Sequence, residues 1–294
     1  MPAYELRGVI PAVPTPVSPQ GNVDVGRLIS FCGHLLAEGA DGLNITGTTG
    51  EATSLSREQR LEIIFAVAGS ALDKRKIMIG TGAAAVADAV TLSRAVGEHG
   101  FAGALVLPPF YFKDPSEAGL LRYFEAIVKS SPDLDIYLYN FPALSGIRFT
   151  IELIAALVHA FGSRIKGLKD SSGDLNYASG VVENFPQLSV FPSNEGTLLQ
   201  AREGKFAGAI SATANLSPAA CAAAFRNGDS DALKRAVAIR AIVAKGSLVP
   251  RIKSVLSRSL SDDYWANVLP PYAPLGTDAA QELFESIQGD LGRF

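Results

Sequence analysis

The 294-residue sequence has few of the residues that commonly serve as metal ligands or redox groups. It contains two cysteines, Cys32 and Cys221, and three histidines, His34, His99 and His159. The cysteines are far apart and each lies in an apolar helical pattern, so we expect buried free thiols in a reducing compartment. The histidines lack metal-ligand spacing, so we predict no metal and no cofactor.

Other signals are absent as well. The net charge is −3 and the basic residues are scattered, which argues against a nucleic-acid partner. No apolar run approaches the roughly 20 residues that span a bilayer, and the N-terminus lacks the features of a signal peptide. The sequence has no Walker loop, dinucleotide fingerprint or Gly-x-Ser-x-Gly motif. We therefore expect a cytoplasmic protein with no nucleic-acid or membrane partner.

What is present is a repeating pattern of short apolar runs and amphipathic segments of helical length. The runs are rich in Val, Ile, Leu and Gly, and most lack strict alternation, which is typical of parallel strands covered by helices. They span residues 8–13, 42–45, 77–81, 104–107, 135–139, 165–169, 188–191 and 207–211. Eight strands, each followed by a helical segment, predict an α/β fold, a closed (β/α)8 TIM barrel.

An open doubly wound sheet is the alternative fold. Such sheets usually bind phosphates at a glycine-rich turn after the first strand. Here that turn is Pro14-Thr15-Pro16, which contains no glycine. The sequence therefore favours the barrel.

Several segments carry helix start signals. Ser56 and Gln59 have the spacing of a capping box, and Thr150 is an N-cap candidate for a helix over residues 151–161. Pro115 stands where a first helical turn is expected to begin.

The strand pattern stops after Gly228, and only helical patterns follow. Three further helices are predicted over residues 231–244, 248–260 and 278–287. We therefore predict a catalytic barrel domain over residues 1–228 and a C-terminal helical extension over residues 229–294.

In such barrels the active site lies at the C-terminal ends of the strands. Reactive or hydrogen-bonding residues at the predicted strand ends are Gly47, Thr48 and Thr49 after the second strand, Tyr111 after the fourth, Tyr139 on the fifth, Lys169 on the sixth and Ser211 on the eighth. We expect the lysine, the two tyrosines and the Gly/Thr segment to face one cavity.

Lys169 is the candidate nucleophile. It ends an apolar run that includes Ile165 and Leu168, and burying an ammonium group there is costly. Loss of solvent favours the neutral amine, which is the form that condenses with a ketone to a Schiff base. An ion pair with Asp170 is the structural alternative. Lys166 is the competing lysine, although it lies nearer the start of the strand.

Two neighbouring features fit imine chemistry. Tyr139 is placed to move protons beside the lysine, whereas a core tyrosine with a satisfied hydroxyl is the simpler interpretation. The glycines of residues 47–50 free backbone N–H groups, and Thr48 and Thr49 add hydroxyls, so the segment is a candidate carboxylate site. Most Gly/Thr turns, however, are only turns.

Four motifs, in this order and spacing, resemble the dihydrodipicolinate synthase/N-acetylneuraminate lyase family of pyruvate-dependent class I aldolases. They are GTTGE at residues 47–51, YNFP at 139–142, GLKD at 167–170 and GAIS at 208–211. The resemblance extends from about Gly8 to Pro270-Pro271. It implies that pyruvate and a small aldehyde or 2-oxo acid are the substrates.

The resemblance also implies roles for individual residues. Lys169 corresponds to the Schiff-base lysine, Tyr139 to the general acid/base and Thr48 to the relay hydroxyl beside it. Thr48 and Thr49 correspond to the pair that holds the pyruvyl carboxylate, and Gly47 belongs to the same turn.

Further roles concern the edge of the site. Tyr111 is similar to a catalytic tyrosine that the synthases lend across a dimer interface, and the family is usually a homotetramer built as a dimer of dimers. Ile210 is similar to the residue whose backbone carbonyl lines the site. Ser211, beside it, is also expected to bind substrate.

Departures from the family motifs bear on the substrate. Leu144 stands where the synthases carry an arginine for the carboxylate of the second substrate, and losing that contact weakens recognition. Residues 142–146 resemble the sialate lyases instead, but Glu195-Gly196 and Ala212 replace the residues that bind the sugar tail. The sequence Ser-Ser-Gly-Asp after Asp170 resembles aldolases for 2-keto-3-deoxy sugar acids or 4-hydroxy-2-oxoglutarate.

The leading hypothesis is a carbon–carbon lyase that cleaves a 2-keto-3-deoxy sugar acid, or a similar 4-hydroxy-2-oxo acid, to pyruvate and an aldehyde. One alternative is 4-hydroxy-tetrahydrodipicolinate (dihydrodipicolinate) synthase, which would use the same lysine for condensation. A second is a 2-oxo acid dehydratase or deaminase. The alternative outside enzymology is a pyruvate-binding module without turnover.

Overall fold

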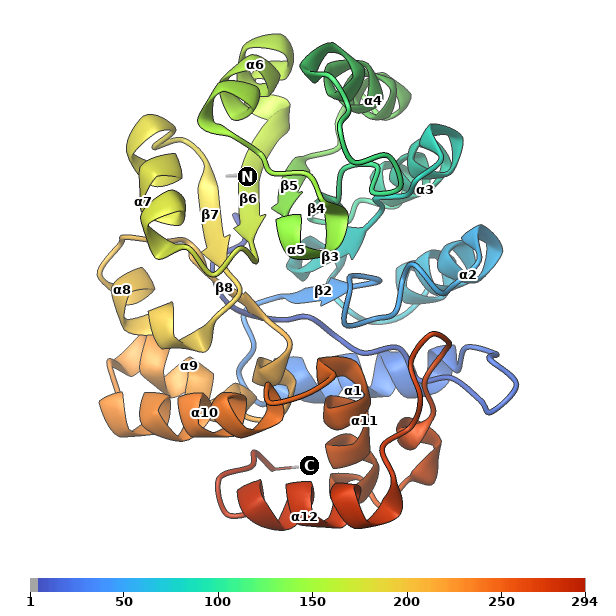
Figure 1. Cartoon of the computed structure of the whole chain (residues 1–294), viewed down its shortest axis with the longest axis vertical. Helices are drawn as coiled ribbons and strands as arrows, with labels where there is room; N and C mark the ends of the chain where they lie inside the picture. Colours follow the sequence, from blue (N-terminus) through green and yellow to red (C-terminus); the bar gives the residue numbers. More distant parts are fainter. Residues whose placement is uncertain (1–4, 294) are drawn as a thin grey trace.

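The computed structural model describes residues 5–293, which form a ring of eight parallel strands enclosed by helices (Figure 1). The strands are β1 (Gly8–Pro11), β2 (Leu43–Ile45), β3 (Ile77–Gly80), β4 (Gly103–Val106), β5 (Ile136–Asn140), β6 (Ile165–Asp170), β7 (Ser189–Pro192) and β8 (Gly208–Ser211). Each overlaps one of the predicted runs. Residues 1–4 of the predicted barrel domain lie outside the described part of the chain.

Backbone hydrogen bonds close the ring. Strands β2 to β7 pair in sequence order, and β1 pairs with β8. The N–H of Ala207 donates to the carbonyl of Val190 at 2.9 Å, which joins β8 to β7. The N–H of Val13 donates to the carbonyl of Asn44, also at 2.9 Å, which joins β1 to β2. The fold is therefore a closed TIM barrel and the open sheet is excluded.

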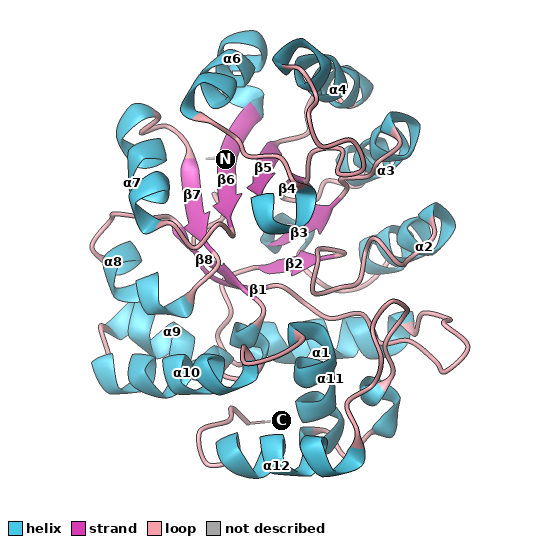
Figure 2. Ribbon diagram, in the orientation of Figure 1, coloured by secondary structure: helices cyan, strands magenta, loops and turns pink. Residues whose placement is uncertain are grey.

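Most helices surround the strands on the outside, whereas the short α5 is drawn over the strand ends (Figure 2). They are α1 (Val25–Ala37), α2 (Arg57–Ala68), α3 (Val86–Glu98), α4 (Glu117–Ser130), α5 (Pro142–Ser145), α6 (Ile151–Phe161), α7 (Leu175–Asn184), α8 (Leu198–Arg202), α9 (Pro218–Asn227), α10 (Ser230–Val243), α11 (Leu248–Ser259) and α12 (Thr277–Ile287). Helices α10, α11 and α12 match the three helices predicted after Gly228, which itself ends α9 with φ of 72°. The division into a barrel domain and an extension stays a prediction.

The predicted helix caps at Ser56 and Thr150 are confirmed. Ser56 and Gln59 exchange the two hydrogen bonds of a capping box, and Thr150 accepts the N–H of Leu153 at 3.1 Å. The expectation for Pro115 was wrong. Helix α4 starts at Glu117, two residues after Pro115, because Ser116 is the N-cap and its hydroxyl accepts a hydrogen bond from the N–H of Gly119.

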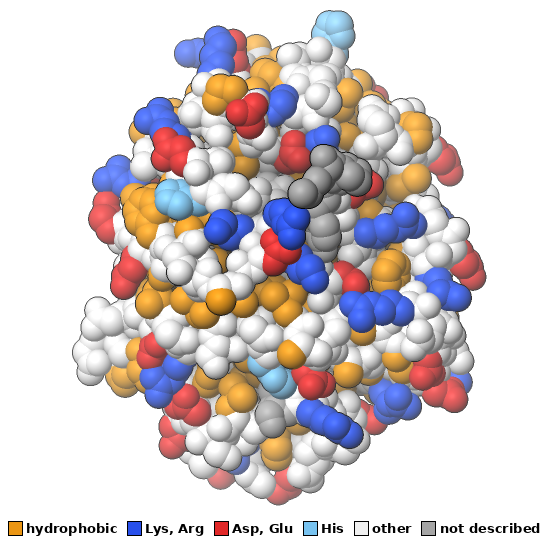
Figure 3. Space-filling view, turned by 180° about the vertical axis from the view of Figure 1, so that it is seen from behind, with side chains coloured by type: hydrophobic (Ala, Val, Ile, Leu, Met, Phe, Trp, Pro, Cys, Tyr) orange, Lys and Arg blue, Asp and Glu red, His pale blue; other side chains and the backbone are white. Residues whose placement is uncertain are grey.

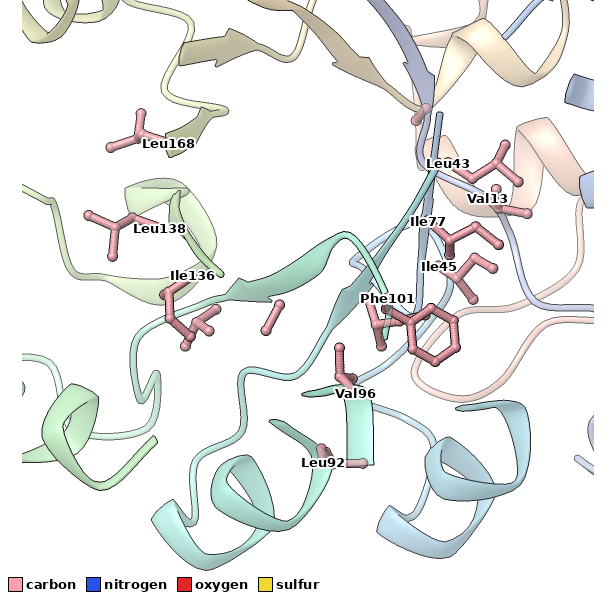
Figure 4. Packing of buried hydrophobic residues seen from close by; sticks show 14 of the residues in the cluster. Val13, Leu43, Ile45, Ile77, Leu92, Val96, Phe101, Ile136, Leu138 and Leu168 are labelled. Carbon is pink, nitrogen blue, oxygen red and sulfur yellow. The ribbon is translucent and has the colours of Figure 1, made fainter. Parts of the chain in front are cut away.

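The core has two layers. The outer layer lies between strands and helices, where Leu43, Ile45 and Ile77 of β2 and β3 pack with Val96 and Phe101 (Figure 4). The inner layer fills the barrel. It consists of the buried residues Leu6, Ile10, Ala12, Met78, Leu105, Tyr137, Tyr139, Phe191 and Ile210. Alternate residues of each strand therefore face opposite layers, which determines which side chains can reach the interior.

On the face turned away from Figure 1, basic and acidic side chains are intermingled (Figure 3). Within residues 5–293, no helix combines the length and the apolar character needed to span a membrane. Both cysteines are buried and unpaired, as expected.

We predict that Ile45→Ala lowers the free energy of unfolding by about 2–5 kcal/mol, because Ile45 is fully buried and its loss leaves a cavity in the outer layer. Urea denaturation checks this. Val237→Ala is the control, since Val237 on α10 is 37% exposed and should change stability by less than about 0.5 kcal/mol. Equal losses in the two variants would show that the outer layer is not tightly packed.

Candidate active site

The mouth of the barrel is built around two adjacent strand ends. Tyr139 of β5 and Lys169 of β6 are direct Cα partners in the parallel pairing. Tyr139 belongs to the inner layer, and the register places Lys169 on the same face. Both residues are 4% exposed. An amine and a phenol are thus held side by side at the carboxyl end of the barrel.

Lys169 has no acidic partner among the described residues. Its Nζ lies 4.3 Å from the centroid of the Tyr139 ring. Asp170, the alternative ion-pair partner, is engaged elsewhere: its carboxylate accepts from Asn140 Nδ2 at 2.7 Å and from the Ser172 hydroxyl at 2.9 Å. Burial raises the pKa of Asp170, and these hydrogen bonds oppose that shift. The alternative ion pair between Lys169 and Asp170 is therefore absent, and no carboxylate of the described residues holds the amine.

The Tyr139 hydroxyl has a specific partner. Its oxygen lies 3.2 Å from Thr48 Oγ1, so either group can donate to the other. Thr48 comes from the segment after β2, on the far side of β3 and β4 from Tyr139. A proton can pass along this pair toward or away from a molecule bound beside it.

The turn that carries Thr48 is unusually shaped. It begins at Thr46 and ends at Glu51, which have φ of 53° and 56°, a region that residues other than glycine rarely adopt. The Thr46 hydroxyl donates to the Gly80 carbonyl at 3.0 Å. A side chain at Gly47 would place its Cβ only 2.6 Å from Asn44 Oδ1. Hydrogen bonds and close packing therefore fix the turn against β2 and β3.

The turn presents free donors. Among the described residues, the backbone N–H groups of Thr48 and Thr49 make no hydrogen bond, whereas the N–H of Glu51 donates to the Thr48 carbonyl at 3.1 Å. Thr49 is 5% exposed. Two unpaired N–H groups with neighbouring hydroxyls form a concave donor site of the kind that binds carboxylates.

Two adjoining cavities open at this turn. The inner cavity is lined by Thr46, Gly47, Thr48, Ala52, Thr53, Gly80, Gly82, Leu105, Leu107 and Tyr139. The outer cavity is lined by Thr48, Glu51, Thr53, Ser54, Leu107, Phe110, Leu144, Pro271 and Tyr272. Thr48, Thr53 and Leu107 belong to both linings, so the two cavities adjoin at these residues. No Lys or Arg is among the residues that line either cavity.

Ser211, Tyr111 and Ile210 differ in where the structure places them relative to the site. Ser211 does not face the barrel interior: its hydroxyl lies 3.3 Å from Thr213 Oγ1 and 3.4 Å from the Arg240 guanidinium, on the helix side of β8. Tyr111 is 76% exposed and stacks edge-on against Phe112, outside both cavities of this chain. The side chain of Ile210 lies in the inner layer with Tyr139.

Some features of the site had not been predicted. Arg60, buried on α2, donates to the carbonyls of Gly80 at 2.9 Å and Gly82 at 3.2 Å, both in the wall of the inner cavity; burial lowers its pKa to about 10. Glu51 pairs with Lys253 of α11. The signal for Lys253 was a lysine on the apolar face of a predicted helix. Within residues 5–293, no cluster of three or more His, Cys, Asp or Glu residues could hold a metal.

A closed TIM barrel with a lysine and a tyrosine side by side at its mouth has the parts of a Schiff-base lyase of the class I aldolase type. The comparisons with known proteins agree. The model of the dihydrodipicolinate synthetase family matches residues 5–289. The chain belongs to this family, whose members are pyruvate-dependent class I aldolases related to N-acetylneuraminate lyase.

Relatives and solved structures match almost the whole chain. An uncharacterized DapA-like lyase from Chloroflexus aurantiacus is 35% identical over 95% of this chain and 95% of its own length. The crystal structure of dihydrodipicolinate synthase from Agrobacterium tumefaciens has a TM-score of 0.88 and 25% identity, covering 96% of this chain and 98% of that one. A prophage protein of the same family from E. coli K12, solved in complex with pyruvate, has a TM-score of 0.87 and 27% identity, covering 98% and 99%.

We predict that Tyr139→Phe lowers kcat by roughly 10²–10⁴, because the phenol is the only acid/base group in contact with both Lys169 and Thr48 among the described residues. Pyruvate release from a 2-oxo acid substrate measures this. Tyr137→Phe is the matched control, since Tyr137 points into the same barrel from the same strand, one layer deeper. Equal losses in the two variants, or none in Tyr139→Phe, would contradict the assignment.

Proposed function

We propose that the protein is a class I aldolase that cleaves a 4-hydroxy-2-oxo acid, of the 2-keto-3-deoxy sugar acid kind, to pyruvate and a neutral aldehyde. The observation that carries the proposal is the buried Lys169 amine, which is in contact with the Tyr139 ring and is paired with no carboxylate of residues 5–293. That arrangement suits an amine that attacks a ketone and a phenol that moves the protons.

The reaction begins with the substrate carboxylate on the turn. Its oxygens accept the N–H groups and hydroxyls of Thr48 and Thr49, which leaves the 2-oxo carbon within reach of Lys169 once that side chain extends past the Tyr139 ring. The amine adds to this carbon, and Tyr139 supplies the proton that turns the carbinolamine hydroxyl into leaving water.

The iminium then acts as an electron sink. Tyr139 removes the proton from the C4 hydroxyl, the C3–C4 bond breaks, and its electron pair moves into the enamine as the aldehyde forms. Thr48, 3.2 Å from the phenol oxygen, relays the proton. Protonation of the enamine at C3 and attack of water on the iminium release pyruvate and restore the free amine.

The lining of the outer cavity favours a neutral aldehyde as the second product. It starts at Thr48, where the C4 substituent would lie, and combines the apolar side chains of Leu107, Phe110 and Leu144 with the hydroxyls of Thr53 and Ser54. Glu51 also borders it, but its carboxylate oxygens are already bonded to Lys253 and to the Leu269 N–H. A second carboxylate would meet no cation there, which disfavours the synthase reaction.

The exposed Tyr111–Phe112 pair supports an assembly of several copies. Two aromatic rings that are each 76% exposed are unusual on the surface of a single chain. We propose that a second copy covers them and receives Tyr111 at its own site, within a homotetramer. Analytical ultracentrifugation tests the assembly: a monomer would refute it.

We predict that pyruvate plus borohydride inactivates the enzyme and adds a reduced pyruvyl group to the peptide that contains Lys169. Peptide mass spectrometry measures the adduct. Lys169→Met should abolish labelling, whereas Lys166→Met, on the same strand but nearer its start, should leave labelling intact. Labelling of Lys166, or of neither lysine, would rule out the mechanism.

We predict that kcat/KM for aldol cleavage of a 2-keto-3-deoxy sugar acid exceeds kcat/KM for condensation of pyruvate with aspartate semialdehyde. Leu144→Arg should shift the ratio toward the semialdehyde, because it adds a cation to the outer cavity. Leu144→Met is the control for size alone. A faster semialdehyde reaction in the unmodified protein would show that the substrate assignment is wrong, even with the imine intact.

A further inference from the structure

A buried ion pair holds the Thr48–Thr49 turn from behind. Oε1 of Glu51, the last residue of the turn, lies 2.6 Å from Nζ of Lys253 on α11, and both side chains are completely buried. The other carboxylate oxygen, Oε2, accepts the N–H of Leu269 at 2.6 Å. Glu51 therefore ties the turn to two separate parts of the chain that follow the barrel strands.

Lys253 and Thr15 complete a network around the turn. Lys253 Nζ also donates to the Thr15 carbonyl at 2.8 Å, and the Thr15 hydroxyl donates to the Gly50 carbonyl at 2.7 Å. The loop after β1, the turn after β2, and helix α11 are thus joined by polar groups of which none is exposed to solvent. Hydrogen bonds in such surroundings are strong and geometrically demanding.

The turn needs this support because its backbone is strained. Thr46 and Glu51 both have positive φ, at 53° and 56°, a conformation that persists in such residues only when the surroundings enforce it. Gly50 lies so close to the loop after β1 that a Cβ there would be 3.1 Å from the Val13 carbonyl oxygen. The Glu51 N–H donates to the Thr48 carbonyl at 3.1 Å, so a shift of Glu51 is transmitted to Thr48.

The hydrogen bond from Leu269 to Glu51 also positions the wall of the outer cavity. Leu269, held by Glu51, is followed by Pro270, whose carbonyl accepts the Ser54 hydroxyl at 2.7 Å. Pro271 and Tyr272, which line the outer cavity, come directly after. One carboxylate thus fixes the donor turn of the inner cavity and the wall of the outer cavity relative to each other.

Neither charge is stable in this place without the other. Burial lowers the pKa of Lys253, and the adjacent Glu51 carboxylate opposes that shift. Removing one partner of such a pair leaves an uncompensated charge, whereas replacing both is often tolerated. Comparing single and double variants therefore distinguishes an effect of the Glu51–Lys253 ion pair from an effect of packing alone.

We propose that Glu51 and Lys253 are positioning residues that set the Thr48–Thr49 turn for carboxylate binding, so that the active site is complete only with helix α11 and residues 267–272 in place. The inference rests on the proposed role of the turn in binding pyruvate. Neither residue touches the reacting atoms; both act through the backbone of the turn.

The test uses the 294-residue chain with Glu51→Gln, Lys253→Met and the double variant. The pyruvate concentration that gives half-maximal borohydride trapping is measured for each, at an equal interval below its own Tm. Each single variant should raise it roughly tenfold or more, with a smaller change in the trapping rate at saturation, and the double variant should recover part of the loss. The control is Arg226→Met, which removes the 2.6 Å ion pair with Asp41 at the opposite end of the barrel and should leave the value unchanged.

A lower Tm with unchanged half-saturation in both single variants would overturn the proposal, because the pair would then only stabilise the fold. If the single variants do not fold, the double variant provides the test. It lacks the hydrogen bond from Lys253 to Thr15, so the pyruvate concentration for half-maximal trapping should rise roughly threefold or more. An unchanged concentration would refute the positioning role.

Hydrogen exchange provides a readout that does not depend on pyruvate. In the folded variants, the peptide that covers residues 46–52 should exchange faster than in the unmodified protein, while helix α6 should not. Unchanged exchange of residues 46–52 would refute the proposal that Glu51 and Lys253 position the turn. A complete lack of pyruvate trapping in the unmodified protein would instead refute the proposed function, without contradicting the effect of the ion pair on the turn.

Discussion

The register between β5 and β6 is the constraint on which the site depends. Pairing Tyr139 with Lys169 places a phenol and an amine side by side on the inner face of the barrel. A shift of one residue would turn both side chains outward, because successive residues of a strand face opposite sides. The inner residues below them, including Tyr137 and Phe191, fill the barrel and keep these two at its mouth.

The second requirement is a donor turn of fixed shape opposite the lysine. The turn takes that shape at the expense of two residues with positive φ, and it is supported by Asn44 and Gly80 beneath it and by Glu51 behind it. Such strain is expected where function requires unpaired backbone donors, since a relaxed turn would satisfy its own N–H groups. The helices after the barrel therefore serve the site as well as the core.

Much of this arrangement could be predicted from the sequence. All eight strands were, because buried parallel strands are continuous apolar runs. The family was found from four short motifs, and the family model and the relatives confirm it. Lys169 was found because a lysine is conspicuous at the end of an apolar strand. The ion pair with Asp170 was left open, and only the structure shows that Asn140 and Ser172 engage that carboxylate.

The rest depended on geometry that the sequence pattern does not carry. The pairing of Glu51 with Lys253 joins residues 202 positions apart, and no local pattern links them. The orientation of Ser211 could have been inferred: if Ile210 points into the barrel, the next residue of the strand must point out. A proline such as Pro115 fits either the first turn of a helix or the position before the N-cap. Only the hydrogen bond of the Ser116 hydroxyl distinguishes the two positions.

Crystals soaked with pyruvate test the central claim most directly. We expect continuous electron density between Lys169 Nζ and C2 of pyruvate, with the carboxylate on the N–H groups of Thr48 and Thr49 and the Tyr139 hydroxyl beside the imine. Pyruvate bound without a covalent bond, attached to Lys166, or with its carboxylate away from the turn would contradict it.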